Sequence, residues 1–340
     1  MDKTIAITRD SKVCFGRVQS LLPQLVASHR TIAVADDNVA RTCSAVVDAY
    51  EHVVIPAGEQ SKTLSTATQL YRTFLERNID RDSLALGIGG GVVTDLAGFV
   101  ASTYMRGIAF GFVPTTLLGM VDASIGGKNG VDFDGYKNIV GTFTQPRFVV
   151  CDTELLATLP DREFRSGLAE IIKAAIIADA DLFTALERAT FEQLRTDTAL
   201  LDSIVAATIR VKAHIVAADE RESGSRRRLN LGHTLAHSIE KVAPHFNHGE
   251  AVAIGLHHTA EAALRHGLLD APSAKRIFAL LDRYGFHTAL PAPISALAEA
   301  MTHDKKRSGD NLHLILPTAI GSVRDCTMTL NETRKLFEEI

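Results

Sequence analysis

The chain has few cysteines, no excess of basic residues and no long apolar run. Its four cysteines are scattered and form no Cys-x-x-Cys pair, so we expect reduced thiols and a reducing, cytoplasmic compartment. A formal net charge of −4 provides no general field that attracts nucleic acid or an anionic membrane. No run of about 18 apolar residues could span a bilayer, and the N-terminal MDKTIAITRDSK lacks the pattern of a secretory signal. The composition therefore gives no reason to expect a nucleic-acid or membrane partner.

The 340 residues are enough for two domains, and the patterns of the two halves differ. In residues 1–151, short β-rich runs alternate with helical stretches, which predicts an α/β domain with a mainly parallel sheet. In residues 152–340 the spacing of apolar residues is helical, apart from a hairpin expected at 311–317 and 321–326. The expected strands of the first domain are 31–35, 51–55, 84–88 and 108–113, and its expected helices are 61–78 and 94–104. The expected helices of the second domain include 162–177, 191–219 and 251–266.

The most informative segment is a glycine turn between an apolar run and an expected helix. The run at 84–88 ends in consecutive glycines, and Gly89-x-Gly91-x-x-Thr94 has the spacing of a dinucleotide-binding turn with its third glycine replaced. Glycines let backbone N–H groups approach a pyrophosphate without interference from side chains. The alternative is a tight strand-to-helix connection that binds no ligand.

A second polar turn follows the strand expected at 51–55. Here Glu59 and Lys62 could hold a ribose or an adenine. Alternatively, Ser61 caps a helix and the neighbouring charges are solvated.

A second glycine-rich loop, 121–130, ends near Lys128 and is soon followed by Lys137. Lysines beside glycine loops suit phosphate or carboxylate groups, because the backbone donates hydrogen bonds and the ammonium neutralises charge. The alternative is an exposed, flexible loop. The later run Arg226–Arg228 is either a solvated cluster of charges or part of a site for an anionic substrate.

A carboxylate and several histidines in the second half have the spacing of a metal site. Gly232-His233-x-x-x-His237 places two imidazoles about one turn apart on one face of a helix, which suits a divalent metal. His248 opens the next helix. Glu170 lies on an expected helix with Lys173 three residues later, so the two side chains point the same way. A single histidine on a helix is more often a surface or hydrogen-bonded core residue.

Together these segments resemble those of one enzyme family. The sequence contains GGGVVTDLAGF, TYMRG, PTTLLGMVDASIGGKNGVDF, FRSGLAEIIK, DERESGSRRRLNLGHTLAHSIE and HGEAVAIG, in the order and spacing of 3-dehydroquinate synthases. The resemblance runs from about residue 32 to 325. It implies an α/β N-terminal NAD-binding domain, an all-α C-terminal domain that binds metal and substrate, and a homodimer.

The resemblance also implies three groups of site residues. The ligands of a divalent metal, zinc or cobalt, would be Glu170, His233 and His248, so that His237 would lie beside the substrate and not on the metal. The residues expected to hold NAD are Asp36, Asn38, Glu59, Lys62, Gly90, Gly91, Val92, Asp95, Thr115, Thr116, Asp122, Lys128, Lys137 and Thr158. The residues expected to line the substrate pocket are Lys128, Asn138, Lys173, Lys212, Arg226, Asn230, His237 and either Lys305 or Lys306, with Arg106 reaching across the dimer.

The implied reaction converts 3-deoxy-D-arabino-heptulosonate 7-phosphate to 3-dehydroquinate and phosphate. NAD would oxidise the C5 hydroxyl, phosphate would leave, the hydride would return, and an intramolecular aldol step would close the ring. Because this substrate carries a carboxylate and a phosphate, a cluster of lysines and arginines in an acidic protein fits it. The alternatives are another sugar-phosphate cyclase of the same superfamily, a metal-dependent polyol dehydrogenase, and a protein that keeps the nucleotide turn only for regulation.

Overall fold

The computed structural model describes residues 4–301 and 311–338 of the chain. Contacts divide these residues into two compact units. The first unit comprises the residues up to Phe164 together with Lys212–Arg221, and the second comprises Arg165–Val211 and the residues from Glu222 on.

The boundary expected after residue 151 lies inside the first unit. Hydrogen bonds explain why the chain on both sides of this point belongs to the same unit. Gly16 N donates to Cys151 O at 3.2 Å, and Val18 N donates to Asp152 Oδ2 at 2.9 Å. The residues after Cys151 are therefore fixed to the start of the first helix.

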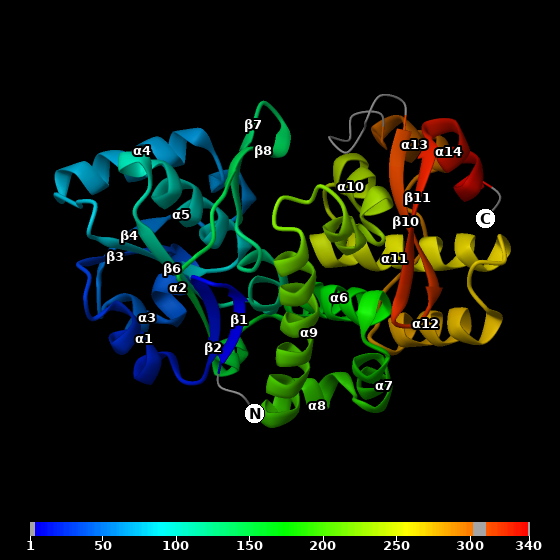
Figure 1. Ribbon diagram of the computed structural model, residues 1–340, viewed down its shortest axis with the longest axis horizontal. Coiled ribbons are helices and arrows are strands. Elements are labelled where there is room, and N and C mark those ends of the chain that lie inside the picture. Colours follow the sequence, from blue (N-terminus) through cyan, green and yellow to red (C-terminus); the bar gives the residue numbers. More distant parts are fainter. Residues whose placement is uncertain (1–3, 302–310, 339–340) are drawn as a thin grey trace. The chain divides into compact units, whose positions relative to one another are not determined.

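The first unit is built on a seven-stranded sheet with the strand order β1-β2-β9-β6-β5-β3-β4 (Figure 1). β1 and β2 pair antiparallel, and the other neighbouring strands of this sheet pair parallel, which confirms the mainly parallel sheet. The strands are β1 (Thr4–Thr8), β2 (Ser11–Phe15), β3 (Thr31–Asp36), β4 (Glu51–Ile55), β5 (Leu84–Gly89), β6 (Ala109–Pro114) and β9 (Phe148–Cys151).

The helices of this unit are α1 (Val18–Val26), α2 (Asp37–Thr42), α3 (Ser44–Val47), α4 (Leu64–Glu76) and α5 (Gly91–Thr103). All residues of the central strand β5 are buried, as a strand in a parallel sheet covered on both faces requires. α5 begins earlier than the expected residue 94. α4 is capped by Thr63, whose Oγ1 accepts a hydrogen bond from Thr66 N at 3.2 Å, so Ser61 does not cap this helix.

A separate two-stranded sheet, β7 (Lys128–Phe133) and β8 (Tyr136–Phe143), forms an arm that extends beyond the main sheet in Figure 1. The glycine-rich loop expected over 121–130 is thus partly regular structure, because a strand begins at Lys128. Asn129 fixes the base of the arm: its Nδ2 donates to Gly127 O at 3.1 Å and to Thr144 O at 2.9 Å.

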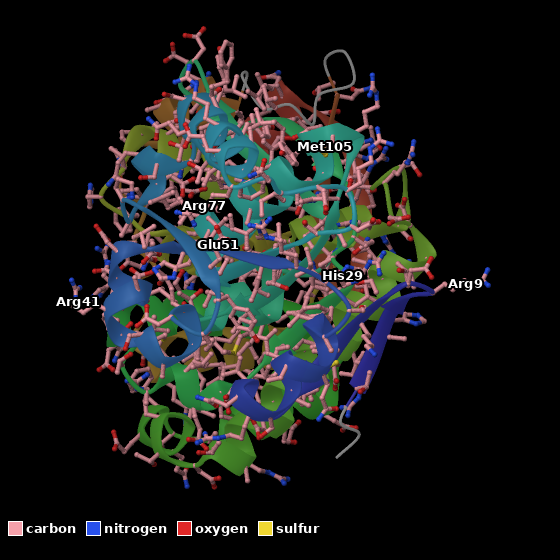
Figure 2. All side chains as sticks on the ribbon, turned by 90° about the vertical axis from the view of Figure 1, so that its left-hand side faces the viewer. Arg9, His29, Arg41, Glu51, Arg77 and Met105 are labelled. Carbon is pink, nitrogen blue, oxygen red and sulfur yellow. The ribbon has the colours of Figure 1, made fainter. Side chains whose placement is uncertain are left out.

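The edge strand β4 carries a charged residue that discourages pairing with another chain. Glu51 lies close to Arg77, as Figure 2 shows, with 3.8 Å between Arg77 Nε and Glu51 Oε1. Arg30 also pairs with Glu51, at 3.0 Å.

The second unit is mainly helical, as expected. Its helices are α6 (Asp161–Ala178), α7 (Ala180–Arg188), α8 (Phe191–Thr196), α9 (Thr198–Ala218), α10 (His233–Val242), α11 (His248–Arg265), α12 (Ala271–Arg283), α13 (Ile294–Met301) and α14 (Leu330–Glu338). The first residues of α6 and the last residues of α9 belong to the first unit. The single helix expected over 191–219 is two helices, because Asp197 has an extended backbone and its Oδ1 accepts a hydrogen bond from Leu200 N at 3.0 Å.

The expected hairpin is confirmed as the antiparallel pair β10 (Asn311–Ala319) and β11 (Ser322–Thr329). Gly321 in its turn donates a backbone hydrogen bond to Ile176 O of α6 at 3.0 Å. In the described ranges, no helix combines the length and apolar character of a membrane span.

Candidate active site

The glycine turn lies where the sequence predicts, between β5 and the N-terminus of α5. Gly90 is the N-cap residue and makes no side-chain capping bond, so the first N–H groups of α5 are not capped there. A Cβ on Gly90 would lie 3.0 Å from Thr116 Cγ2, and one on Gly91 would lie 3.3 Å from Ala123 Cβ. The turn therefore needs glycine for close packing, and it presents a helix N-terminus that suits an anionic phosphate.

Lys62 and Asp95, both expected at the nucleotide, form a buried ion pair with 2.6 Å between Lys62 Nζ and Asp95 Oδ2. Glu59 is also within reach of Lys62, at 3.8 Å. Burial alone would lower the pKa of Lys62, but the carboxylates of Asp95 and Glu59 outweigh it and raise the pKa, so the ammonium stays charged. The interpretation of Lys62 as a solvated charge is wrong.

The other residues expected to bind the nucleotide lie in several turns and near the ends of several strands. Asp36 ends β3 and accepts a hydrogen bond from Val39 N at 2.8 Å, which caps α2. Asn38 Oδ1 accepts from Arg41 at 2.7 Å. Thr115 and Thr116 follow β6, whereas Val92 lies in the first turn of α5 and Thr158 is exposed before α6.

Lys212 and Asp122 are in direct contact within the first unit. Lys212 Nζ donates to Asp122 O at 2.7 Å and also bonds to Asp122 Oδ1. Lys212 is buried on α9, and Asp122 lies in the π-helical turn Gly119–Ala123. A residue expected at the substrate and one expected at the nucleotide are thus brought together.

Two lysines and one asparagine that were expected to bind NAD or the substrate lie on the β7–β8 arm. Lys128, Lys137 and Asn138 are exposed, and Asn138 has a φ of +53°. Asn138 N donates to Asp132 Oδ1 at 2.8 Å, which holds this bend of the strand. Arg106 is exposed in a different turn, with a φ of +69°.

The three expected metal ligands converge in the second unit. Glu170 lies on α6, whereas His233 and His248 are the first residues of α10 and α11. One donor atom from each lies within 4.8 Å of the other two. Glu170 Oε1 is 3.2 Å from His248 Nε2 and 3.6 Å from His233 Nε2. A carboxylate oxygen and two imidazole nitrogens are suitable ligands for zinc or cobalt, so the donor set fits a divalent metal.

Contacts on the outer side of each ligand orient its donor atom toward this point. Glu170 Oε2 forms an ion pair with Lys173, which leaves Oε1 facing the histidines. His233 Nδ1 lies 3.1 Å from Leu231 O, which favours a proton on Nδ1 and a free electron pair on Nε2. Burial disfavours the charged form of His248, but Glu170 and Glu240 outweigh it and raise the pKa of His248 to about 10 in the metal-free protein.

Close backbone packing brings the helices of the candidate metal ligands together. Ser166 Oγ, one turn before Glu170 on α6, accepts a hydrogen bond from Gly249 N at 3.0 Å. Gly232 caps α10 with a φ of +77°, and a Cβ on Gly255 would lie 2.1 Å from Gly232 O. Only glycine allows α10 and α11 to approach this closely.

The remaining substrate candidates of the second unit lie near the start of α10. The ring of His237 lies 5.5 Å from that of His233, edge to face, but His237 is not in the group that could hold a metal. Arg226 is buried, so the run of three arginines is not simply a solvated cluster. Asn230 Nδ2 donates to Glu222 Oε1 at 2.6 Å. Lys305 and Lys306 lie outside the described residues.

The sequence interpretation missed Ser166 and Glu240, which contact the segments of the candidate metal ligands. Their helical spacing was a usable signal, since Ser166 is four residues before Glu170 and Glu240 is three residues after His237.

Two family models match the chain, 3-dehydroquinate synthase N-terminal over residues 52–166 and 3-dehydroquinate synthase C-terminal over residues 167–307. A 3-dehydroquinate synthase of Picosynechococcus sp. is 46% identical over 278 residues, which cover 79% of this chain and 76% of the relative. The 3-dehydroquinate synthase of Halorhodospira halophila is 43% identical over 310 residues, which cover 89% of this chain and 88% of the relative.

Solved structures of two synthases have a similar fold. The 2-epi-5-epi-valiolone synthase of Streptomyces hygroscopicus, with NAD+ and Zn2+ bound, is 28% identical with a TM-score of 0.87, over 95% of this chain and 94% of that one. A 2-deoxy-scyllo-inosose synthase complexed with carbaglucose-6-phosphate, NAD+ and Co2+ is 24% identical with a TM-score of 0.89, over 99% of both chains, and shows the shared fold alone.

Proposed function

Because the chain belongs to the 3-dehydroquinate synthase family, we propose that it converts 3-deoxy-D-arabino-heptulosonate 7-phosphate to 3-dehydroquinate and inorganic phosphate. The observation that carries this proposal is the convergence of Glu170, His233 and His248, in a chain that also has a glycine turn for a nucleotide. Both features belong to a reaction in which a substrate hydroxyl is oxidised and later restored.

Glu170, His233 and His248 would hold a divalent metal ion, zinc or cobalt. When bound, the metal would acidify a substrate hydroxyl and NAD would accept and return a hydride. Gly90, Gly91 and the uncapped N–H groups of α5 would receive the pyrophosphate of NAD. The ion pair of Lys62 and Asp95 would stiffen the neighbouring wall of this site.

The cationic residues would bind and orient the two anionic groups of the substrate. Arg226 is buried, and a guanidinium suits bidentate binding of a carboxylate, the group that distinguishes this substrate from sugar phosphates without one. Asn230 would support it from the end of the same 3-10 helix, Ser225–Asn230. We also assign Lys128, Lys212, Asn138 and Lys173, together with Lys305 or Lys306, to substrate binding.

The elimination step requires a base for the C–H bond beside the new ketone. An oxygen of the substrate phosphate is suited to this role, because it is held in the same pocket as the carbon that loses the proton. His237, whose ring lies beside that of His233, is the second candidate.

We also propose a homodimer that acts in the cytoplasm, where a phosphorylated metabolite and NAD are available. On the β7–β8 arm, Phe133 is 53% exposed and Phe143 is 50% exposed. Met105, labelled in Figure 2, is 40% exposed. Large apolar side chains exposed in this way are typical of protein interfaces. Arg106 follows Met105 and would reach the partner's substrate.

The test is an assay of the purified protein with NAD and Zn2+ or Co2+. Inorganic phosphate should appear in step with 3-dehydroquinate, and NADH should not accumulate. Phosphate release from sedoheptulose 7-phosphate but not from the heptulosonate would favour another cyclase. Stoichiometric NADH from a polyol would favour a dehydrogenase.

A further inference from the structure

Glu240 lies behind one of the metal-binding histidines. It is on α10, about two helical turns after His233 and therefore on the same side of this helix. Its Oε1 is 3.8 Å from His248 Nδ1, whereas His248 Nε2 faces Glu170 Oε1 at 3.2 Å. The side chain of Glu240 is only 11% exposed, so water screens this contact weakly.

A second histidine also has a carboxylate near its Nδ1, but its Nε2 has a different partner. His258 Nδ1 lies 3.7 Å from Glu261 Oε2, but His258 Nε2 lies 2.9 Å from Thr288 O. The outward nitrogen of His258 is therefore used by a backbone carbonyl and cannot bind a metal. In His248 the corresponding nitrogen faces the other two ligands, so here the carboxylate supports a donor atom.

Glu240 also affects the balance of charge at the proposed metal site. The negative charge of Glu170 is already matched by Lys173, since both side chains are at least 97% buried and their charged atoms are in contact. The two imidazoles bring no negative charge when they bind a metal. A divalent cation at this point would thus be poorly neutralised by its own ligands. Glu240 adds a negative charge on the outer side of His248.

We propose that Glu240 is a positioning residue of the metal centre. It holds His248 with the proton on Nδ1 and the Nε2 electron pair toward the metal, and its charge increases the affinity for a divalent cation. This inference rests on the proposed function, because it assigns a residue that supports the metal ligands of the same site.

The test measures metal binding without substrate or NAD. The metal-free protein is titrated with Co2+ in a competition with a chelator, and the visible absorption of bound Co2+ is recorded. Glu240→Gln keeps the shape of the side chain and removes its charge. We expect the Co2+ affinity to fall on the order of 10- to 100-fold and the absorption band to shift. Glu240→Asp should restore part of the affinity.

Glu261→Gln is the matched control, because it removes the carboxylate of the other histidine pair. It should leave Co2+ affinity and spectrum unchanged. Circular dichroism identifies folded variants, and Glu240→Ala replaces Glu240→Gln if the latter does not fold. A folded variant without the Glu240 carboxylate that binds Co2+ like the wild type would overturn the inference. If the wild type binds Co2+ but releases no phosphate from the heptulosonate, the proposed function fails while this binding test stands.

Discussion

Gly249 is pressed against Ser166: a Cβ on Gly249 would lie 2.2 Å from Ser166 Cα. Gly249 follows the proposed metal ligand His248, and Ser166 precedes Glu170 by one helical turn. The contact therefore sets the distance between two of the three proposed ligands. A side chain at position 249 must push α6 and α11 apart.

Gly249→Ala should consequently weaken metal binding as well as the fold. Overpacking of this kind costs about 1–3 kcal/mol of unfolding free energy, and the displacement of His248 should lower Co2+ affinity. Thermal melting and Co2+ titration measure the two effects. Gly91→Ala is the comparison: its Cβ would lie 3.3 Å from Ala123 Cβ in the first unit, so it should cost less stability and leave Co2+ affinity unchanged. Normal Co2+ affinity in Gly249→Ala would show that this contact does not position the ligands.

Glu170→Gln should abolish turnover and reduce metal content. The change removes the charged ligand and leaves the buried ammonium of Lys173 without its carboxylate partner, so the metal-free protein should also be less stable. Metal analysis after dialysis and thermal melting test these effects. The double variant Glu170→Gln, Lys173→Met should recover part of the stability but no activity. Full turnover by metal-depleted Glu170→Gln would contradict the assigned ligand role.

The Lys62–Asp95 pair should be worth much more to the fold than a surface ion pair, because Lys62 is only 5% exposed. Removing one partner of a buried pair typically costs about 3–5 kcal/mol. Lys62→Met and Asp95→Asn should each lower stability, and the double variant should lose less than the sum. Urea unfolding of the four proteins measures the coupling. If the stability losses of the two single variants add up to the loss of the double variant, the interaction between Lys62 and Asp95 contributes nothing to stability.

The stability of the metal-free protein should depend on the protonation of His248. The folded protein raises the pKa of this histidine from its ordinary value of 6.5 to about 10. A raised pKa stabilises the fold at low pH, so this contribution is complete below about pH 6.5 and disappears as the pH approaches 10. The difference in melting temperature between the wild type and His248→Gln should shrink over this range. A difference in melting temperature that stays constant between these pH values would contradict the raised pKa of His248.

The sequence predicted the parallel core of the first unit well, because its strands are apolar runs separated by turn residues. It did not predict β1 and β2, whose buried residues are interrupted by Thr, Lys and exposed positions. It also missed β9, a buried apolar run of only four residues. The glycine turn was found through its spacing. Its fit to Thr116 and Ala123 could not be predicted, since these neighbours come from a later segment.

The metal ligands illustrate the same limit. The spacing of His233 and His237 predicted a pair on one helix face, and their rings do lie together. Spacing alone could not show that Glu170 and His248 lie together with His233 and not with His237. That choice depends on how α6, α10 and α11 pack. The resemblance to a family supplied that choice, and the geometry of the donor atoms agrees with it.

His233 and His248 each occupy the first position of a helix, so two positive helix ends lie at the proposed metal centre. Such ends oppose a bare cation but favour an anionic oxygen beside it. The centre is therefore better suited to a cation together with an oxyanion than to a cation alone, and a substrate whose alcohol loses its proton would supply that oxyanion.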